Sequence, residues 1–373
     1  MADFPQETSE ARLTGLKPGP LADDLSRRSF LKSAALAGAG TFAARQVAVA
    51  QQPTSLPNDG LARDTSQAPV PMKPMGKTGL QVSALGVGGY HLGSAKNQTE
   101  VNAIVSRALD AGINFFDNAW DYHDGESEER LGEALKGKRD QAIVMTKVCT
   151  HGRDKNVAMM QLEQSLRRLK TDHLDVWQIH EVVYYNDPDL IFRPDGAIEA
   201  LALAKQQGKV RFVGFTGHKH PDIHLKMLSH GFPFDTVQMP LNPFDANFRS
   251  FQQHVLPEAN RRGMAVFGMK SLGGSGEFVS HGAVTVADAL RYAMSLPVAT
   301  TISGMESLGV LEQNLEIARG FKPLSHAEMR AIEDRCAKWA ADGRYELFKT
   351  STKYDGKVGR EQHEYPTVEK LPA

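Results

Sequence analysis

Phe115-Phe116-Asp117-Asn118-Ala119-Trp120-Asp121-Tyr122 begins inside an apolar run, predicted as a strand over 113–118, and ends in polar side chains. Seven similar runs lie along the chain, at 82–87, 142–148, 174–179, 210–215, 236–241, 265–269 and 299–303. Apolar residues with helical spacing follow each strand, at 101–111, 128–135, 157–169, 198–207, 220–228, 251–261, 286–295 and 308–319. Short buried runs that alternate with amphipathic helices are typical of a parallel sheet.

This alternation predicts an α/β fold of the (β/α)8 TIM-barrel type over residues 73–340, because such a barrel needs eight strand–helix units in about 250 residues. An extra helix is predicted over 325–340, and residues 341–373 are predicted to form a polar C-terminal tail on the surface. An open, doubly wound sheet is the competing architecture. The strand count and the lack of a Gly-rich first turn weigh against it.

The N-terminal 50 residues have the pattern of an export signal. Ser26-Arg27-Arg28-Ser29-Phe30-Leu31-Lys32 is followed by an Ala- and Gly-rich stretch over 33–44 and by Ala48-Val49-Ala50. This pattern resembles a twin-arginine (Tat) signal peptide, which directs folded proteins to the Tat export machinery. We therefore expect a signal peptide over 1–50, a linker over 51–72 and a periplasmic location. A disordered basic tail is the alternative.

Composition and charge exclude several classes of protein. The chain has 43 Lys and Arg against 44 Asp and Glu, a formal net charge of -1, so nothing favours a nucleic-acid partner. No charge-free apolar run approaches the roughly 20 residues of a stable membrane span. Cys149 and Cys336 are the only cysteines, too few for a four-cysteine zinc or iron–sulfur site. No metal site is expected.

Four polar residues stand where three consecutive strands end: Asp117, Tyr122, Lys147 and His180. In a barrel these ends meet at one mouth. A Lys147 ammonium is expected to lower the pKa of the Tyr122 phenol, and Asp117 to hold Lys147 in place. Alone, each residue has an ordinary explanation, namely a helix cap, a packed ring, a rim lysine and a structural histidine. Together they suit protonation of an oxyanion, a general-acid role.

These stretches resemble the aldo-keto reductase family. Residues 115–119 with Tyr122, 127–135 and 175–180 are similar to its second- and fourth-strand motifs. Residues 75–83 are similar to the opening β-hairpin that caps the barrel bottom. The resemblance implies that Asp117, Tyr122, Lys147 and His180 form the family's catalytic tetrad. It also implies reduction of an aldehyde or ketone, with Tyr122 donating the proton and a reduced nicotinamide cofactor supplying the hydride.

By the same resemblance, the cofactor is NADPH or NADH and lies at the ends of strands five to eight. The implied cofactor-binding residues are Thr216, His218, Gln238, Lys270, Leu272, Gly273, Gly304, Glu306 and Asn314. Gln238 would hold the nicotinamide amide, and residues 269–274 would bind the pyrophosphate. Thr216-Gly217 replaces the family's Ser-Asn, with His218 as a possible substitute. Leu241 would cover the ring where the family stacks a tyrosine.

The choice between the two nucleotides depends on one carboxylate. Gly304 and Val310 occupy positions where the family commonly has a basic residue that binds the ribose 2′-phosphate of NADPH. Glu306 lies nearby. A carboxylate disfavours the phosphate of NADPH and can accept from the ribose hydroxyl of NADH. Glu306 could equally be a solvated residue at a helix start. Tyr90, Trp120 and Tyr184 are the expected substrate-binding residues.

Two other functions compete with the reductase. One is a cofactor-binding barrel that acts as a redox sensor or regulatory subunit with little turnover. The other is a barrel hydrolase or lyase, which would need paired acids or metal ligands at the strand ends. Export poses a further question, because a periplasm offers no obvious pool of reduced nicotinamide. We therefore expect a tightly bound cofactor that is recycled without dissociating.

Overall fold

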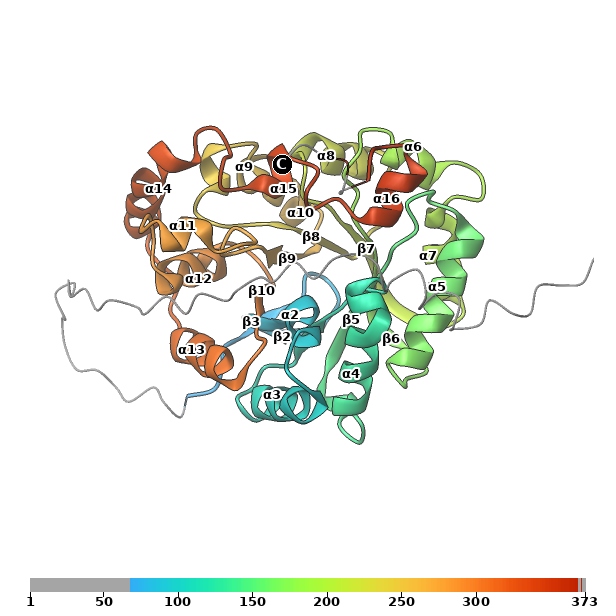
Figure 1. The fold of residues 1–373 in the computed structure, drawn as a ribbon, viewed down its shortest axis with the longest axis horizontal. Helices are drawn as coiled ribbons and strands as arrows, with labels where there is room; N and C mark the ends of the chain where they lie inside the picture. The colour runs from blue at the N-terminus through green and yellow to red at the C-terminus, as the bar shows by residue number, and fades with distance from the viewer. Residues whose placement is uncertain (1–67, 368–369, 371–373) are drawn as a thin grey trace, which may run out of the picture. The chain divides into compact units, whose positions relative to one another are not determined.

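The computed structural model describes residues 68–367 and residue 370, so the predicted signal peptide and most of the linker lie outside the described residues. Its central feature is a closed barrel of eight parallel strands in the order β10-β3-β4-β5-β6-β7-β8-β9 (Figure 1). The strands are β1 (Met72–Pro74), β2 (Gln81–Ser83), β3 (Leu85–Gly88), β4 (Phe115–Asp117), β5 (Ile143–Val148), β6 (Leu174–Ile179), β7 (Val210–Thr216), β8 (Thr236–Pro240), β9 (Ala265–Met269) and β10 (Thr300–Gly304). The predicted (β/α)8 barrel is confirmed.

Helices surround the barrel. They are α2 (Gly89–Gly93), α3 (Gln98–Asp110), α4 (Glu126–Ala134), α5 (Lys155–Arg168), α6 (Asp187–Phe192), α7 (Ala197–Gln206), α8 (Pro221–Ser229), α9 (Phe251–His254), α10 (Leu256–Arg261), α11 (Glu277–Ser280), α12 (Val286–Ser295), α13 (Leu308–Ala318), α14 (His326–Ala340), α15 (Leu347–Thr350) and α16 (Lys357–Gln362). Short 3-10 turns span Tyr122–Gly125, Arg139–Gln141 and Asp245–Asn247. The extra helix predicted over 325–340 is α14.

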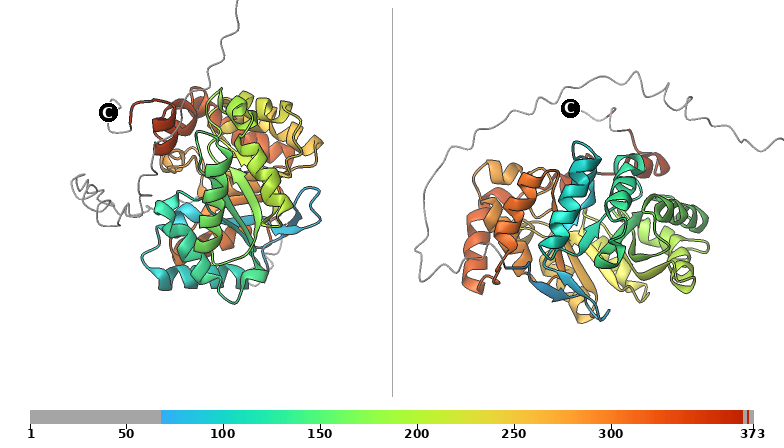
Figure 2. Two further views of the ribbon diagram at one scale, coloured as in Figure 1. Left: turned by 90° about the vertical axis from the view of Figure 1, so that its right-hand side faces the viewer. Right: turned by 90° about the horizontal axis from the view of Figure 1, so that it is seen from below.

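The hairpin of β1 and β2 closes the end of the barrel where the strands begin (Figure 2). The Lys77 amide donates to the Gly263 carbonyl (3.0 Å), just before β9, and the Ser83 amide donates to Asn114 Oδ1 (2.9 Å), just before β4. Met75 and Val82 are fully buried in the cluster that fills the barrel interior. The predicted hairpin cap is thus present, and the opposite end of the barrel is left for the functional loops.

Two predicted elements are divided in the structure. The strand predicted over 82–87 is two strands, because β2 pairs with β1 in the hairpin, whereas β3 pairs with β4 and β10 in the barrel. The helix predicted over 251–261 is split into α9 and α10 near Val255. Pro257 lies in the first turn of α10, and proline lacks the N–H that a continuous helix would use there.

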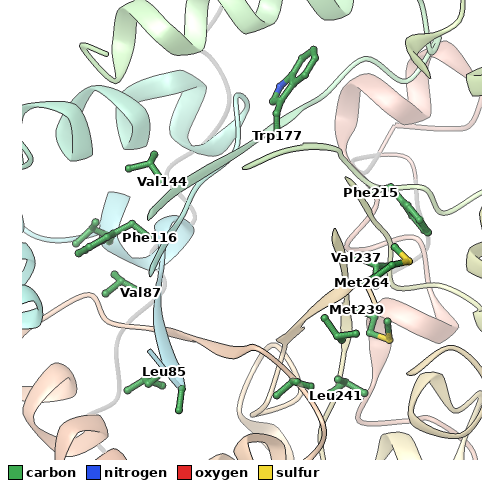
Figure 3. Close-up of a cluster of buried hydrophobic side chains, with 14 of the residues drawn as sticks. Leu85, Val87, Phe116, Val144, Trp177, Phe215, Val237, Met239, Leu241 and Met264 are labelled. Carbon is green, nitrogen blue, oxygen red and sulfur yellow. The ribbon is translucent and has the colours of Figure 1, made fainter. Parts of the chain in front are cut away.

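The hydrophobic core has two shells. Apolar residues that point inward fill the barrel, and those that point outward pack beneath the helices. Figure 3 shows the outer shell as side chains radiating from the ring of strands, among them Phe116, Trp177, Phe215 and Met239. Since side chains alternate along a strand, this outer shell fixes which residues face the interior. In β8, Val237 and Met239 point outward, so Gln238 points inward.

His224 of α8 is a core histidine that supports β8. It is fully buried between the rings of Phe215 and Phe251, and its Nε2–H donates to the Gln238 carbonyl (3.3 Å). Burial lowers the pKa of His224 to about 4, so the folded chain holds it neutral.

This buried imidazole predicts acid sensitivity. Between pH 6.5 and 4 the unfolded chain protonates His224 and the folded chain does not, so the associated stability is present above pH 6.5 and lost as the pH falls. Between pH 7 and pH 5 this group should remove about 2 kcal/mol from the free energy of unfolding. Urea unfolding at both pH values measures it. His224→Gln, which keeps an N–H donor but does not titrate, should show a loss smaller by that amount. An equal loss in both proteins would contradict the assignment.

Candidate active site

The four residues predicted at the barrel mouth lie together in the structure. Asp117 ends β4, Lys147 lies in β5, His180 follows β6, and Tyr122 begins the 3-10 turn after β4. In the sheet register, Asp117 lies opposite Met145 and Lys147 lies opposite Gln178. The parallel strands therefore bring the four side chains to one edge, as the sequence predicts.

Lys147 is the centre of the group. Its side chain is 1% exposed, and its ammonium donates to Asp117 Oδ1 (2.5 Å), to the Asn118 carbonyl (2.6 Å) and to the Tyr122 hydroxyl (3.3 Å). An ammonium has three N–H donors, so these three partners fix its position. Asp117 therefore holds Lys147 against the phenol, as expected.

The pKa of Tyr122 differs from the value expected from the sequence. Lys147 was expected to lower the pKa of the phenol. Instead, burial and the carboxylates of Asp117, Asp121 and Glu181 raise the pKa of Tyr122 well above its usual value. Asp117 neutralises much of the charge of Lys147, so the ammonium does not determine the pKa of Tyr122. At neutral pH the phenol is therefore fully protonated.

His180 is positioned from both sides. Its backbone N–H donates to the Val148 carbonyl (2.9 Å), and its own carbonyl accepts from the Arg153 guanidinium (2.8 Å). The His180 and Tyr122 rings lie edge to face, with centroids 5.7 Å apart. The two side chains can thus converge on one carbonyl oxygen. Arg153 was not predicted from the sequence, because nothing in the sequence distinguishes a buried loop arginine from a surface one.

The β7 and β8 ends fit the amide of a nicotinamide. Gln238 is 1% exposed, and its Oε1 has no hydrogen-bond partner among the described residues. A buried amide oxygen left unpaired costs about 1–3 kcal/mol, which a ligand N–H would recover. Thr216 is buried at the end of neighbouring β7. Leu241, in contrast, belongs to the outer core with Val237 and does not face the interior, so the expectation that it covers the ring is wrong.

The loop after β9 has the features of an anion-binding turn. Lys270 has φ 55°, a conformation that non-glycine residues rarely adopt, and burial lowers its pKa to about 8. Gly273 has φ 70°, and a Cβ there would lie 2.4 Å from the Phe278 ring. The strained backbone of Lys270, unlike that of the glycine, is of a kind that clusters at ligand sites. Leu272 is half-buried between these two residues.

The loop after β10 is held by Asn314. Its Nδ2 donates to Ser303 Oγ (3.2 Å) and weakly to the Gly304 carbonyl (3.4 Å). A Cβ on Gly304 would lie 2.5 Å from the His91 ring, so a small residue is required there. Glu306 is exposed and adds a negative charge that raises the pKa of His91, although burial lowers that pKa overall. His91 was not predicted from the sequence as a site residue.

The three expected substrate-binding residues do not form one wall. Tyr90 is exposed at the mouth, and its ring meets the Tyr122 ring edge to face at 5.5 Å. Trp120 packs on Arg168 and donates to Gln164 Oε1 (2.6 Å), both on α5. The Tyr184 ring packs at a tilt against the rings of His363 and Tyr365, with centroids 4.4 and 5.0 Å away. Of the three, the structure places only Tyr90 in ring contact with the tetrad.

Residues 341–367, here called the C-terminal segment, lie over the strand ends beside α8 and α6 (Figure 1). Lys349 is fully buried, and its ammonium donates to Asp245 Oδ1 (2.6 Å) and Glu346 Oε2 (3.0 Å). Lys219, after β7, donates to Asp355 Oδ1 (2.6 Å). The tail predicted from this polar composition is therefore a packed part of the mouth, because its charges pair in buried sites.

The C-terminal segment also contacts two predicted cofactor-binding residues. The Lys270 ammonium lies 5.4 Å from the ring centroids of both Phe348 and Tyr354. Burial lowers the pKa of His218 well below its usual value, and its neutral ring donates from Nδ1 to the Phe348 carbonyl (3.0 Å). His218 is therefore engaged by protein in this structure, rather than directed at an amide.

Comparison with known proteins gives the family. A profile of the Aldo/keto reductase family matches residues 84–281, more than half of the chain. Aldo-keto reductase YhdN of Bacillus subtilis is 30% identical over 197 residues, which are 49% of this chain and 56% of that protein. The 6-dehydroglucose reductase of Novosphingobium aromaticivorans is 30% identical over 228 residues, which are 56% of this chain and 72% of that protein.

Solved structures agree with the sequence relatives. The holo form of aldo-keto reductase AKR11C1 from Bacillus halodurans superposes with a TM-score of 0.61 at 25% identity, covering 74% of this chain and 99% of the other. The chain belongs to the aldo/keto reductase family. It spans about half to two thirds of the length of several curated relatives that it matches. Among the described residues, none of the helices is both long and apolar enough to cross a bilayer.

Proposed function

We propose that this protein is an NAD(P)H-dependent oxidoreductase that reduces an aldehyde or ketone to an alcohol. The observation that carries the proposal is the buried Lys147 ammonium, which bonds Asp117 and the Tyr122 hydroxyl at once. The names of two relatives, 6-dehydroglucose reductase and methylglyoxal reductase YeaE of Escherichia coli, support reduction as the reaction. A reduced nicotinamide, when bound, supplies the hydride that the side chains cannot.

Tyr122 is the proposed proton donor. The substrate oxygen would lie between the Tyr122 hydroxyl and the His180 ring, and both could donate to it. Once carbon has accepted a hydride, the oxygen becomes an alkoxide that is far more basic than a phenolate, so the Tyr122 proton moves to it. Lys147 then stabilises the phenolate, and Asp117 prevents the ammonium from moving away. The products would be the alcohol and the oxidised nicotinamide, and the Tyr122 phenolate would regain its proton from solvent.

The cofactor-binding roles are also part of the proposal. Gln238 would bind the carboxamide through its unpaired Oε1, and Lys270 with the turn at Gly273 would face the pyrophosphate. Glu306 would lie near the ribose. Because the C-terminal segment contacts Lys270 and His218, its position would control how fast a nucleotide leaves.

We further propose that the chain is exported in folded form by the Tat machinery and works in the periplasm. The twin-arginine pattern over residues 26–32 supports this location. A retained cofactor, recycled by a second substrate, would suit a compartment without a nicotinamide pool. Rapid exchange of the bound nucleotide with free labelled nucleotide would contradict retention.

The first experiment is a fluorescence titration of the full-length chain with NADPH and, separately, with NADH. We expect Glu306→Gln to tighten NADPH binding about fivefold, since one exposed charge contributes up to roughly 1 kcal/mol, and to leave NADH binding unchanged or weaker. Glu316→Gln, an exposed acid on α13, is the matched control and should change neither affinity.

The outcomes separate the alternatives. If neither nucleotide binds and none copurifies, the oxidoreductase proposal is wrong. If a nucleotide binds but a range of aldehydes and ketones is not reduced, the barrel acts as a cofactor-binding sensor. If Glu306→Gln and Glu316→Gln have equal effects, Glu306 is a solvated residue without a ribose contact.

A further inference from the structure

A second group of polar side chains, which could bind a metal ion, includes His180 and two residues that do not bond to Lys147. Asp121 follows β4, Cys149 follows β5 and His180 follows β6. One side-chain atom from each lies within 4.8 Å of the other two. A carboxylate oxygen, a thiol sulfur and an imidazole nitrogen are the donor set that Zn²⁺ prefers. No metal site was expected from the sequence, because two cysteines are too few for a four-cysteine site and no cluster of His, Asp and Glu was recognised at the strand ends.

The buried polar atoms of this group make close but poorly directed contacts with one another. His180 Nδ1 lies 3.2 Å from Asp121 Oδ1, an ion-pair separation, but the two atoms are not aligned for a well-directed hydrogen bond, and neither has another directed partner among the described residues. His180 as a residue is only 7% exposed. A simple ion pair would be expected to align the ring N–H with the oxygen. An ion between the two atoms would satisfy both lone pairs at once.

The spacing also fits a tetrahedral ion. Bond lengths near 2.0–2.3 Å place neighbouring ligand atoms about 3.3–3.7 Å apart, so the 3.2 Å separation of Asp121 Oδ1 and His180 Nδ1 needs little change. The Cys149 sulfur, within 4.8 Å of both, needs a shift of at most about 1.5 Å. The Asp121 side chain is 27% exposed, which gives an ion a path of entry.

Neighbouring residues contact this group and restrict its geometry. His151 Nε2 lies 3.2 Å from Cys149 Sγ and can donate an N–H to a thiolate. The same nitrogen lies 3.4 Å from Glu181 Oε2, which orients the ring. The backbone N–H of Cys149 donates to Gln161 Oε1 (2.7 Å) and fixes the residue. Partners of this kind commonly orient metal ligands and tune their affinity.

We propose that Asp121, Cys149 and His180 bind one Zn²⁺-type divalent ion. With three protein ligands, a tetrahedral ion keeps its fourth position for water or another ligand. Binding through Nδ1 leaves Nε2 of His180 free for the substrate oxygen, so the ion and the proposed reductase are compatible. The ion site does not depend on that proposal, because its residues bind metal whether or not a carbonyl is reduced.

The experiment uses the full-length chain without a histidine tag, reduced and stripped of metal. Titration with Co²⁺ should give one ion per chain, with a near-ultraviolet thiolate-to-cobalt band and the intense visible bands of a tetrahedral ion. Zn²⁺ should displace the Co²⁺ and abolish these bands. Cys149→Ser should remove the thiolate band and weaken binding more than about 100-fold, since loss of an outer partner alone costs 10–100-fold. Asp121→Asn should weaken binding while keeping the thiolate band at saturating Co²⁺.

Cys336→Ser is the matched control, because Cys336 is the other buried free cysteine and lies on α14. Its spectrum and affinity should equal those of the parent chain. Circular dichroism confirms that each variant folds, and Asp121→Asn tests the site should Cys149→Ser unfold. A chain that shows no thiolate band with excess Co²⁺ overturns the proposal. So does a band that survives in Cys149→Ser. Nucleotide binding is measured separately, so failure of the ion site leaves the reductase proposal intact.

Discussion

Replacing Tyr122 with phenylalanine should lower kcat for carbonyl reduction by roughly 100- to 10,000-fold, the usual contribution of a positioned general acid. The change removes one oxygen and keeps the ring, so the edge-to-face contacts with Tyr90 and His180 can persist. Lys147 keeps Asp117 and the Asn118 carbonyl as partners. Nucleotide affinity and the free energy of unfolding should therefore change little.

The measurement is the initial rate of NADPH and NADH consumption by the full-length chain, with methylglyoxal and 4-nitrobenzaldehyde as probe carbonyls. Tyr185→Phe is the matched control, since this tyrosine is 60% exposed and its ring lies near His220, away from the tetrad. It should keep the parent rate. Equal rates for Tyr122→Phe and the parent chain would remove Tyr122 as the acid and leave the tetrad without a proton donor.

The fold and the tetrad were predictable because both depend on local pattern and register. Strand period, helix period and their order along the chain specify a barrel with little help from long-range contacts. Once the barrel is predicted, the residues at consecutive strand ends must meet. Asp117, Lys147 and His180 follow from counting positions along β4, β5 and β6.

The electrostatics of the tetrad could not be predicted by pairing charges along the sequence. The sequence shows that Lys147 lies near Tyr122, but the pKa of the phenol depends on burial and on three carboxylates, one of which, Glu181, comes from another loop. Side-chain direction is a second case. Leu241 was placed at the cofactor by alignment to a family position, whereas the alternation of Val237 and Met239 directs it to the outer core.

The buried ion pairs of the C-terminal segment could not be predicted, for a related reason. Its polar composition is typical of a solvated tail, yet Lys349 is fully buried against Asp245, 104 residues earlier in the chain. A charged side chain can be buried when its ion-pair partner is buried with it, and no local sequence pattern indicates such a pair. Composition therefore predicts burial poorly wherever charges are matched over long distances.

Replacing Arg153 with methionine should lower the free energy of unfolding by about 3–5 kcal/mol, the usual cost of removing one partner from a buried ion pair. The guanidinium is fully buried and donates to Asp187 Oδ1 (3.0 Å) and to the carbonyls of Thr150 (3.1 Å), His180 (2.8 Å) and Glu181 (2.7 Å). Methionine fills part of the volume but leaves a buried carboxylate and three carbonyls without this donor.

Urea unfolding measures the loss of stability, and two further variants show what causes it. Arg193→Met removes an exposed guanidinium that donates to the nearby Gly152 carbonyl (3.1 Å) and should cost less than about 1 kcal/mol. Arg153→Met combined with Asp187→Asn should recover part of the loss, because the neutral amide no longer leaves a buried charge, and its oxygen can still accept from the Val183 and Tyr184 amides.

The same variants test how His180 is positioned. Arg153 has φ 58°, a strained conformation that the surrounding bonds must maintain at a cost of about 1–3 kcal/mol. If the guanidinium holds this loop, Arg153→Met should also lower kcat, since the His180 carbonyl loses its donor while the tetrad side chains stay unchanged. If Arg153→Met is as mild as Arg193→Met, packing alone fixes the loop, and the placement of His180 does not depend on the buried ion pair.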